Sequence, residues 1–248
     1  MTNQDALSTI IYAIYFFAFI SIFYIINHRR NIKIEWGCKE KHFSILPLAL
    51  LVVIIFQLGL NSPVNSIIKN IFGFSHPALS PFDSLTFLIG AIILGPIFEE
   101  IIFRGIFLRG LLFSYSPKYA IIISSVLFGI IHVQPFQIWG AILLGLFFGL
   151  IYYKTQNIII TIILHSISNT SSFLNIYFSN KFATPNFSSD TIQHINIVIV
   201  IISLIILITL FRNSILKLSN IELKTNESIE EKTPVPNTWQ NLLGQMRR

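Results

Sequence analysis

Long stretches of Ile, Leu, Val and Phe alternate with shorter polar segments along the chain. Most of the apolar stretches are close to the roughly 18 to 20 residues that an α-helix needs to cross about 30 Å of hydrocarbon. This pattern predicts an all-α fold, a polytopic membrane bundle of about seven transmembrane helices. We expect spans near residues 9–26, 44–60, 84–112, 119–133, 137–153, 158–174 and 192–211.

The polar segments divide the chain further. Residues 1–83 hold the first two spans and a segment rich in Pro and Ser, 61–83, which we expect to be an interfacial loop with a short amphipathic turn. Residues 84–174 form a core of apolar spans, and residues 175–212 hold the last loop and span. Residues 213–248 are polar and predict a cytoplasmic tail, for much of which we expect no fixed fold.

Composition agrees with a membrane location. Hydrophobic residues make up 53% of the chain and charged residues only 11%, whereas a soluble domain carries roughly 25% charged residues. The single cysteine, Cys38, excludes an intrachain disulfide and a multi-cysteine metal site. The net charge is +6, but the basic residues lie between apolar runs and not on one amphipathic face, so we expect no nucleic acid partner.

The distribution of Lys and Arg predicts the orientation. The residues before the first span include neither, so this span lacks the charged start of a secretory signal and we expect it to be retained. If the spans alternate in direction, one side of the membrane receives only Lys69 and Lys181. The other side receives Arg29, Arg30, Lys33, Lys39, Lys41, Arg104, Arg109, Lys118, Lys154, Arg212 and Lys217. Because cytoplasmic segments are rich in Lys and Arg, we expect an outside N-terminus and a cytoplasmic C-terminus. The chain is compact and rich in Ile, so we expect a bacterial cell membrane.

Charged and titratable residues inside the apolar core are few. Within residues 84–189 the only carboxylates are Glu99 and Glu100, and the only histidines are His132 and His165. A charged side chain near the bilayer centre costs several kcal/mol, on the order of 3 on insertion scales, so such residues generally mark functional sites.

The two glutamates are expected to have different roles. Successive residues on an α-helix point about 100° apart, so Glu99 and Glu100 face different directions. Arg104 follows Glu100 by four residues, a spacing at which two side chains share a helix face. That pair fits a structural ion pair.

The polar residues lie at similar depths. At about 1.5 Å per residue, Glu99 and His132 lie roughly 20 Å from the cytoplasmic ends of their spans, and His165 and Asn169 roughly 10 to 16 Å from theirs. By spacing, Asn169 shares a helix face with His165, as Phe128 does with His132. Any one of these residues alone is more typical of packing or interhelical hydrogen bonding. Their shared depth predicts a polar cavity, which we expect to open to the cytoplasmic half of the bilayer.

Glutamate and histidine in a dry pocket suit general acid–base catalysis. We expect Glu99 or Glu100 to activate a water molecule. A histidine and Asn169 are candidate donors to the oxyanion that forms when water attacks an amide. A serine nucleophile is disfavoured, because the serines beside His165 do not face it on a helix.

A metal-assisted mechanism stays open. A catalytic zinc typically has three protein ligands, and Glu99, His132 and His165 would satisfy that number. The chain lacks the H-E-x-x-H signature, which places two histidines and a general base on one helix. We therefore expect direct activation of water by glutamate and no required cofactor.

Three motifs carry a family resemblance. "EEIIFR", "FGIIH" and "HSISN" resemble, in order, the E-E-x-x-x-R, F-x-x-x-H and H-x-x-x-N motifs of the CAAX-processing and bacteriocin-immunity family, the Abi-type intramembrane proteases related to type II CAAX prenyl endopeptidases. "FGLIYYKTQNI", ahead of the third motif, is similar as well. The resemblance covers about residues 84–172. Each motif alone is weak, whereas three in order inside apolar spans are specific.

The resemblance implies a membrane-embedded endopeptidase in which Glu99 activates water. The implied catalytic positions are Glu99, His132, His165 and Asn169, and the implied supporting positions are Glu100, Arg104 and Phe128. Eukaryotic relatives cleave after a prenylated cysteine, a modification that bacteria generally lack. Bacterial relatives are linked to bacteriocin immunity and peptide-pheromone maturation, so the expected partner is a membrane-associated peptide substrate.

Two other functions compete with a protease. The first is a non-catalytic immunity or partner-binding membrane protein with the same fold, which the loss of a motif residue would have favoured. The second is a proton-coupled transporter, because intramembrane Glu and His also relay protons. Transporters often have paired broken helices, but only Gly95–Pro96 suggests a break here. We expect it to kink the third span just before Glu99 and to widen the room for water.

Overall fold

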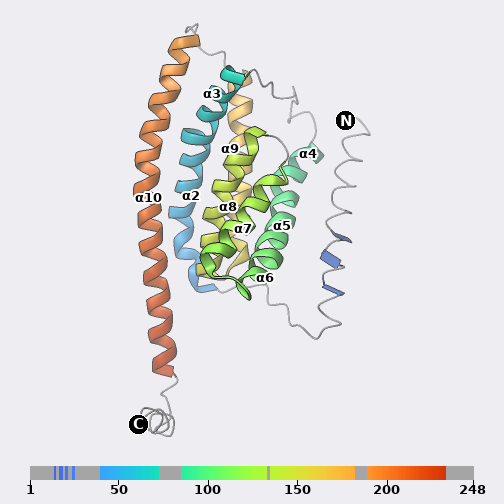
Figure 1. Ribbon diagram of the computed structural model, residues 1–248, viewed down its shortest axis with the longest axis vertical. Helices are drawn as coiled ribbons and strands as arrows, with labels where there is room; N and C mark the ends of the chain where they lie inside the picture. The colour runs from blue at the N-terminus through green and yellow to red at the C-terminus, as the bar shows by residue number, and fades with distance from the viewer. Residues whose placement is uncertain are drawn as a thin grey trace.

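The computed structural model of the protein describes residues 40–72, 85–132, 135–181 and 189–232, together with a few positions between residues 14 and 25. Within these ranges the chain is helical apart from short connections (Figure 1). Most of the first expected span, 9–26, lies outside the described residues. The all-α, polytopic membrane fold predicted from the apolar pattern is confirmed, because several helices are long and apolar enough to cross a membrane.

Four helical segments in the described ranges have the length and composition of a transmembrane span. They are Phe43–Ile68, Gln137–Thr155, Ile158–Phe178 and Thr191–Ser214. These segments overlap the spans expected near 44–60, 137–153, 158–174 and 192–211. The span expected near 119–133 corresponds to a shorter apolar helix, Pro117–Ile130.

The second expected span is a continuous helix that is longer than predicted. It consists of η1 (Glu40–Ile45), α2 (Leu46–Ile55), the π-helical η2 (Phe56–Asn61) and α3 (Ser62–Phe72). The loop expected at 61–83 is therefore wrong as far as residue 72, and the remainder lies outside the described residues. Pro63 follows the wide turns of η2, and such turns help a helix to pass a proline, which lacks an N–H and crowds the preceding turn.

The third expected span also contains π-helical turns. It consists of α4 (Leu85–Ile89), the π-helical η3 (Gly90–Leu94), α5 (Gly95–Glu100), the π-helical η4 (Ile101–Leu108) and α6 (Arg109–Leu112). The irregularity expected at Gly95–Pro96 takes the form of wide turns on both sides of the short helix α5. Because π-helical turns shift the direction of the side chains that follow, they set where Glu99 and Glu100 point.

The rest of the bundle consists of α7 (Pro117–Ile130), α8 (Pro135–Thr155), α9 (Ile158–Lys181) and α10 (Ser189–Lys232). Helix α10 continues well past its expected end near residue 211, into the tail for which little fold was expected. It lies at the edge of the bundle (Figure 1), and only 6% of the apolar stretch within Thr191–Ser214 is buried. This exposure is what a helix in contact with lipid requires.

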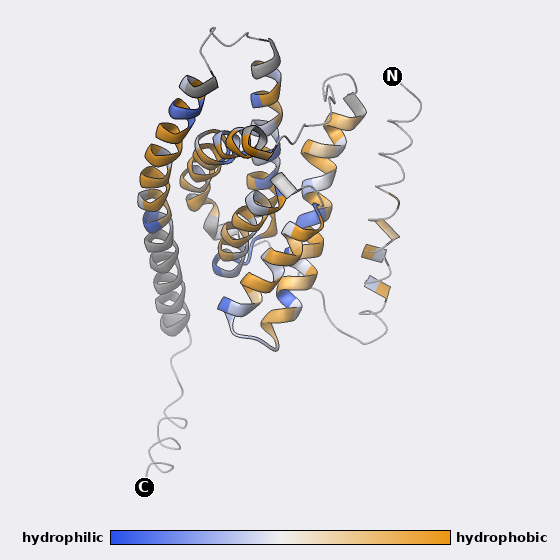
Figure 2. Ribbon diagram, turned by 45° about the horizontal axis from the view of Figure 1, so that its top comes forward, coloured by the Kyte–Doolittle hydropathy of each residue, from blue (hydrophilic) through white to orange (hydrophobic). Residues whose placement is uncertain are grey.

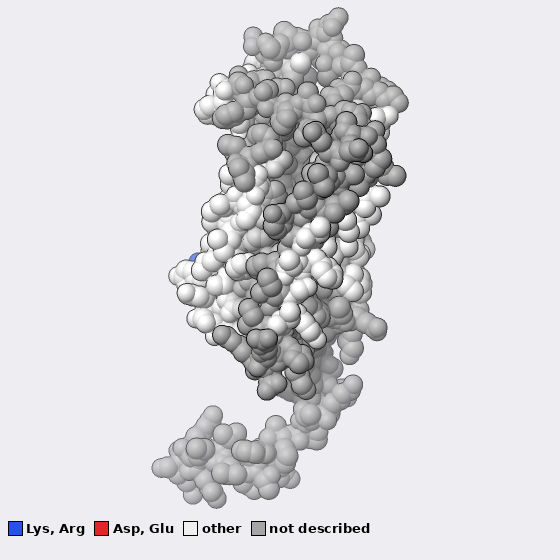
Figure 3. All heavy atoms as spheres, turned by 90° about the vertical axis from the view of Figure 1, so that its right-hand side faces the viewer, with Lys and Arg blue, Asp and Glu red and all other residues white. Residues whose placement is uncertain are grey.

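The outside of the described bundle is apolar. Figure 2 shows hydrophobic residues along the outward faces of the helices. The side shown in Figure 3 has almost no Lys, Arg, Asp or Glu atoms on the described part of its surface. Large side chains such as Ile205 and Ile208 are 62% and 69% exposed. A surface of this kind suits hydrocarbon better than water.

Basic residues mark one end of the bundle. Arg109 and Lys118 lie where α6 gives way to α7, and Lys154 lies where α8 ends (Figure 1). We call this end the basic end. Helix α7 ends and α8 begins at the opposite end, which we call the far end.

Candidate active site

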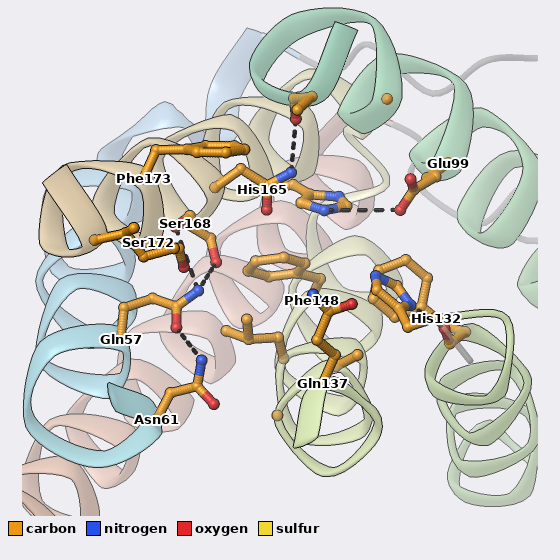
Figure 4. Close-up of a pocket in the computed structure, with 18 of the residues that line it drawn as sticks. Gln57, Asn61, Glu99, His132, Gln137, Phe148, His165, Ser168, Ser172 and Phe173 are labelled. Carbon is orange, nitrogen blue, oxygen red and sulfur yellow. Dashed lines mark hydrogen bonds and ion pairs between the residues drawn. The ribbon is translucent and has the colours of Figure 1, made fainter. Parts of the chain in front are cut away.

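A cavity of about 500 Å³ lies between the helices. It is lined by η2, α3, the segment from α4 to α5, the end of α7, and the helices α8 and α9. Glu99, His132, His165 and Asn169 all line it, although they come from three different expected spans (Figure 4). The structure therefore brings together the groups whose similar depth predicted a shared cavity.

Glu100 and Arg104 form a buried ion pair beneath this cavity. Nη1 of Arg104 lies 2.9 Å from Oε1 of Glu100, and the two side chains are 1% and 0% exposed. Nη2 of Arg104 donates to the backbone carbonyl of Gly145 on α8 at 3.3 Å. The guanidinium also lies 4.6 Å from the centre of the Phe128 ring, a cation–π arrangement. A buried charge is tolerated only with such partners, so the pair ties the third span to α7 and α8.

His165 lies between the two glutamates. Its Nδ1 is 2.9 Å from Oε1 of Glu100, and its Nε2 is 3.8 Å from Oε2 of Glu99. A carboxylate paired with Arg104 accepts hydrogen bonds, so Nδ1 carries the hydrogen and donates. Glu100 thereby fixes the orientation of the His165 ring and turns Nε2 toward Glu99 and the cavity.

Glu99 has a different environment from its neighbour. Its side chain is 13% exposed and lines the cavity, whereas Glu100 is completely buried. The two carboxylates thus point in different directions, as their adjacent positions on a helix predict. Of the two, only Glu99 lines the space in which a substrate or a water molecule would bind.

His132 also has one fixed ring nitrogen. Its Nδ1 donates to the backbone carbonyl of Phe128 at 2.8 Å, because a carbonyl oxygen can only accept. In the neutral ring, Nε2 then carries no hydrogen and is a proton acceptor. The Phe128 ring lies between the two histidines, with its centre 5.0 Å from that of His132 and 5.6 Å from that of His165. His132 can therefore donate a hydrogen bond through Nε2 only when it is protonated.

Asn169 links α9 to the π-helical turns of η3. Its Nδ2 donates to the backbone carbonyl of Ala91 at 2.8 Å. Wide turns leave some backbone carbonyls without their regular helical hydrogen-bond donor. The Asn169 side chain supplies a donor to one such carbonyl. Because a carboxamide has two N–H groups, Asn169 retains a second donor beside the cavity that it lines.

Sequence reasoning missed several polar residues of the cavity. Gln57, Asn61 and Asn65 line it from η2 and α3, and Gln137 and Ser168 line it from α8 and α9. The available signal was the spacing of the first three residues, four apart on one helix face. That signal is weak, because uncharged amides are less costly than charges inside an apolar run.

The three residues considered as zinc ligands do not form a metal site here. Among the described residues, no group of three or more His, Cys, Asp or Glu side chains is placed to hold a metal ion. His132 and His165 each have the kind of second partner that orients metal-binding histidines. We derive no chemical step through a metal.

The lining residues indicate toward which end of the bundle the cavity extends. Among the described residues, His165 and Phe148 are the cavity's lining residues nearest the basic end. Its remaining lining residues, such as Asn65, Phe87 and Ile176, lie toward the far end. The expected opening to the cytoplasmic half stays a prediction, because it depends on which end of the bundle lies in the cytoplasm. Counting residues along the spans predicted the depth of the polar groups. It did not predict toward which end of the bundle the cavity extends.

Comparisons with known proteins bear on the same region. Residues 81–171 match the family described as type II CAAX prenyl endopeptidase Rce1-like. The chain is also 38% identical over 78 residues to "Putative membrane peptidase YdiL" of Bacillus subtilis (strain 168). That similarity covers 32% of this chain and 32% of the relative, so the chain matches about a third of the length of this curated relative. No solved structure matches the chain.

The matched residues contain the three motifs, the four polar groups of the cavity and the buried ion pair. Gln57, Asn61 and Asn65 lie outside the match. Residues 81–171 are thus similar to the type II CAAX prenyl endopeptidase Rce1-like family.

Proposed function

We propose that this protein is an intramembrane endopeptidase that hydrolyses a peptide bond by means of water activated by Glu99. One observation carries the proposal: Glu99, His132, His165 and Asn169, from three spans, line one cavity inside an apolar bundle. The family match and the membrane peptidase relative support the same class of reaction.

The chemistry follows from the positions of the groups. Glu99 takes a proton from water as the water oxygen attacks the carbonyl carbon of the substrate. It then returns that proton to the nitrogen that leaves when the C–N bond breaks. The second N–H of Asn169 and protonated His132 are the donors beside the cavity that fit a negatively charged oxygen. Because the cavity is enclosed by apolar helices, these hydrogen bonds are stronger than they would be in water.

Glu100 and Arg104 act through His165. Their ion pair fixes Nδ1 of His165, so that Nε2 stays directed at the Glu99 side of the cavity. His165 is then a proton acceptor or donor of fixed direction next to the proposed base. Glu100 and Arg104 are positioning residues in this scheme.

The proposed substrate is a membrane-associated peptide. The cavity is large enough for a few residues of a peptide, and its far-end position admits a substrate from the outer half of the bilayer if the basic end is cytoplasmic. Bacteriocin immunity and peptide-pheromone maturation are the proposed biological roles, by similarity to bacterial members of the family.

The test uses purified protein in lipid nanodiscs with a mixture of short synthetic peptides, and mass spectrometry to detect new peptide ends. We expect wild type to cleave some of these peptides and Glu99→Gln to cleave them about 100-fold more slowly or less, because the general base is lost. Equal cleavage by the variant would exclude Glu99 as the base. A wild type and variant that both bind peptides without cleaving any would favour a non-catalytic binding protein.

A further inference from the structure

A row of three carboxamides runs along one wall of the cavity. Gln57, Asn61 and Asn65 follow one another at four-residue intervals through η2 and into α3, and all three line the cavity. In Figure 4, Gln57 and Asn61 lie on the opposite side of the cavity from Glu99 and His132. We call these three residues the amide row.

The amide row is held in place by hydrogen bonds at both ends. Nε2 of Gln57 donates to Oγ of Ser168 at 2.6 Å and to the Ser168 carbonyl at 3.3 Å. Nδ2 of Asn61 donates to Gln57 at 2.7 Å, and Nδ2 of Asn65 donates to Asn61 at 3.3 Å. At the other end, Nε1 of Trp139 donates to Asn65 at 2.9 Å. The carbonyl oxygens of the row are therefore used within the protein.

Asn61 and Asn65 each keep one N–H group that these hydrogen bonds do not use. A carboxamide has two N–H groups, and Asn61 and Asn65 each use one of them within the described residues. Both side chains are partly buried and line the cavity. A polar donor facing a cavity inside a membrane is costly unless a water molecule or a ligand satisfies it. The row thus presents a series of hydrogen-bond donors to whatever occupies the cavity.

The spacing of these donors matches that of a peptide backbone. Residues four apart on a helix are separated by about 6 Å along its axis. In an extended chain, carbonyl groups on the same edge recur every second residue, at about 6.6 Å. The carbonyls along one edge of an extended peptide can therefore accept hydrogen bonds from Asn61 and Asn65 in turn.

The opposite helix is shaped to allow this row. A Cβ atom added to Gly140 on α8 would lie 2.6 Å from Oδ1 of Asn61, so a larger residue at this position would make the Asn61 side chain move. The remaining wall toward the far end includes the apolar side chains of Phe87, Phe173 and Ile176. The cavity thus pairs donors for a backbone with apolar surface for side chains.

We propose that the amide row is the subsite that binds the backbone of an extended, apolar peptide and leads its scissile bond to Glu99. This inference rests on the proposed peptidase function and deepens it, because it names a specificity-determining surface outside the family match. The row acts on binding. It does not take part in the proton transfers.

The experiment uses the nanodisc assay and the peptide that wild type cleaves best from the synthetic mixture. We expect Asn61→Leu to raise KM about tenfold and to leave kcat nearly unchanged, because a hydrogen bond made equally in the ground and transition states is lost. The matched control is Asn175→Leu. Asn175 donates to Oγ of Ser62 at 2.7 Å but does not line the cavity, so its loss should leave KM unchanged.

A second arm does not depend on the folding of a variant. The same peptide is remade with one backbone amide at a time replaced by an ester, whose carbonyl is a weaker acceptor. With wild type, we expect esters at positions two residues apart to raise KM. With Asn61→Leu, we expect the same esters to have little further effect on KM. In a double-mutant cycle, this non-additivity is the signature of a direct contact.

The outcomes separate the two proposals. If Glu99→Gln cleaves like wild type, the peptidase mechanism fails and the row loses its basis. If Glu99→Gln is inactive while Asn61→Leu keeps the wild-type KM and no ester position matters, the amide row is only a structural network. An equal rise in KM for Asn61→Leu and Asn175→Leu would also overturn the inference.

Discussion

Arg104 is the residue on which the arrangement of the site depends most. It is 1% exposed, and it contacts Glu100, the Gly145 carbonyl and the Phe128 ring. Through Glu100 it determines the direction of His165. The Arg104 side chain thus links the packing of the helices against one another to the geometry of the cavity.

We predict that Arg104→Ala lowers both the amount of folded protein and its activity. Removal of one partner of a buried ion pair typically costs about 3 to 5 kcal/mol, because the other charge stays buried. The measurement is yield and thermal unfolding in detergent, with Arg109→Ala at the basic end as the control. Wild-type yield and unfolding temperature for Arg104→Ala would show that the pair is not structural.

Sequence alone was enough to find the charged residues of the site and Asn169 but not the three amides of the amide row. Glu99, Glu100 and Arg104 stand out because charges are rare inside apolar runs. Gln57 was missed because its partner, Ser168, is 111 residues away, and no local pattern reports such a contact. The direction of the ring nitrogens of His165 was also out of reach, since it depends on tertiary contacts with both glutamates.

At the scale of the elements, close contact between α7 and α8 holds two cavity walls together. A Cβ atom added to Gly129 on α7 would lie 3.0 Å from the backbone oxygen of Ile138 on α8 and 2.3 Å from Cγ1 of Ile142. Small residues allow membrane helices to approach in this way. Phe128, next to Gly129, is thereby held against Arg104 and both histidines.

We predict that Gly129→Ala destabilises the protein by about 1 to 3 kcal/mol, since a backbone atom is in the way and cannot rotate aside. Gly110→Ala is the matched control, because a Cβ atom there meets nothing within 4 Å. Thermal unfolding in detergent compares the two. A Gly129→Ala protein as stable as Gly110→Ala would mean that α7 and α8 do not pack this closely.

The elements themselves were predicted unevenly. Apolar length located α8 and α9, because a long unbroken run has few alternatives to a helix. Composition misjudged α3, where Pro and Ser indicated a loop but the wide turns of η2 carry the helix past Pro63. Such π-helical turns have no signature in the apolar pattern.

At the scale of the whole molecule, the bundle has a basic end and a cavity that extends toward the far end. The excess of Lys and Arg there favours a cytoplasmic location for the basic end. With that orientation, we predict that a substrate reaches the cavity from the outer side.

We predict that Gln137, an exposed residue of the cavity lining, is accessible from outside the cell, and that Ser116, between α6 and α7, is accessible from the cytoplasm. The measurement labels Gln137→Cys and Ser116→Cys, each combined with Cys38→Ser, with a membrane-impermeant thiol reagent in intact cells and in inverted vesicles. Labelling of Ser116→Cys in intact cells and of Gln137→Cys only in inverted vesicles would reverse the orientation.

The most direct test of the central claim is a comparison of the peptide ends in host membranes that carry either wild type or Glu99→Gln at matched expression. Our account predicts peptide ends that occur only with wild type, while both proteins are folded and present in equal amounts. Those ends would also identify the substrate. The same peptide ends with both proteins, together with an intact phenotype in the variant, would contradict a peptidase that depends on Glu99.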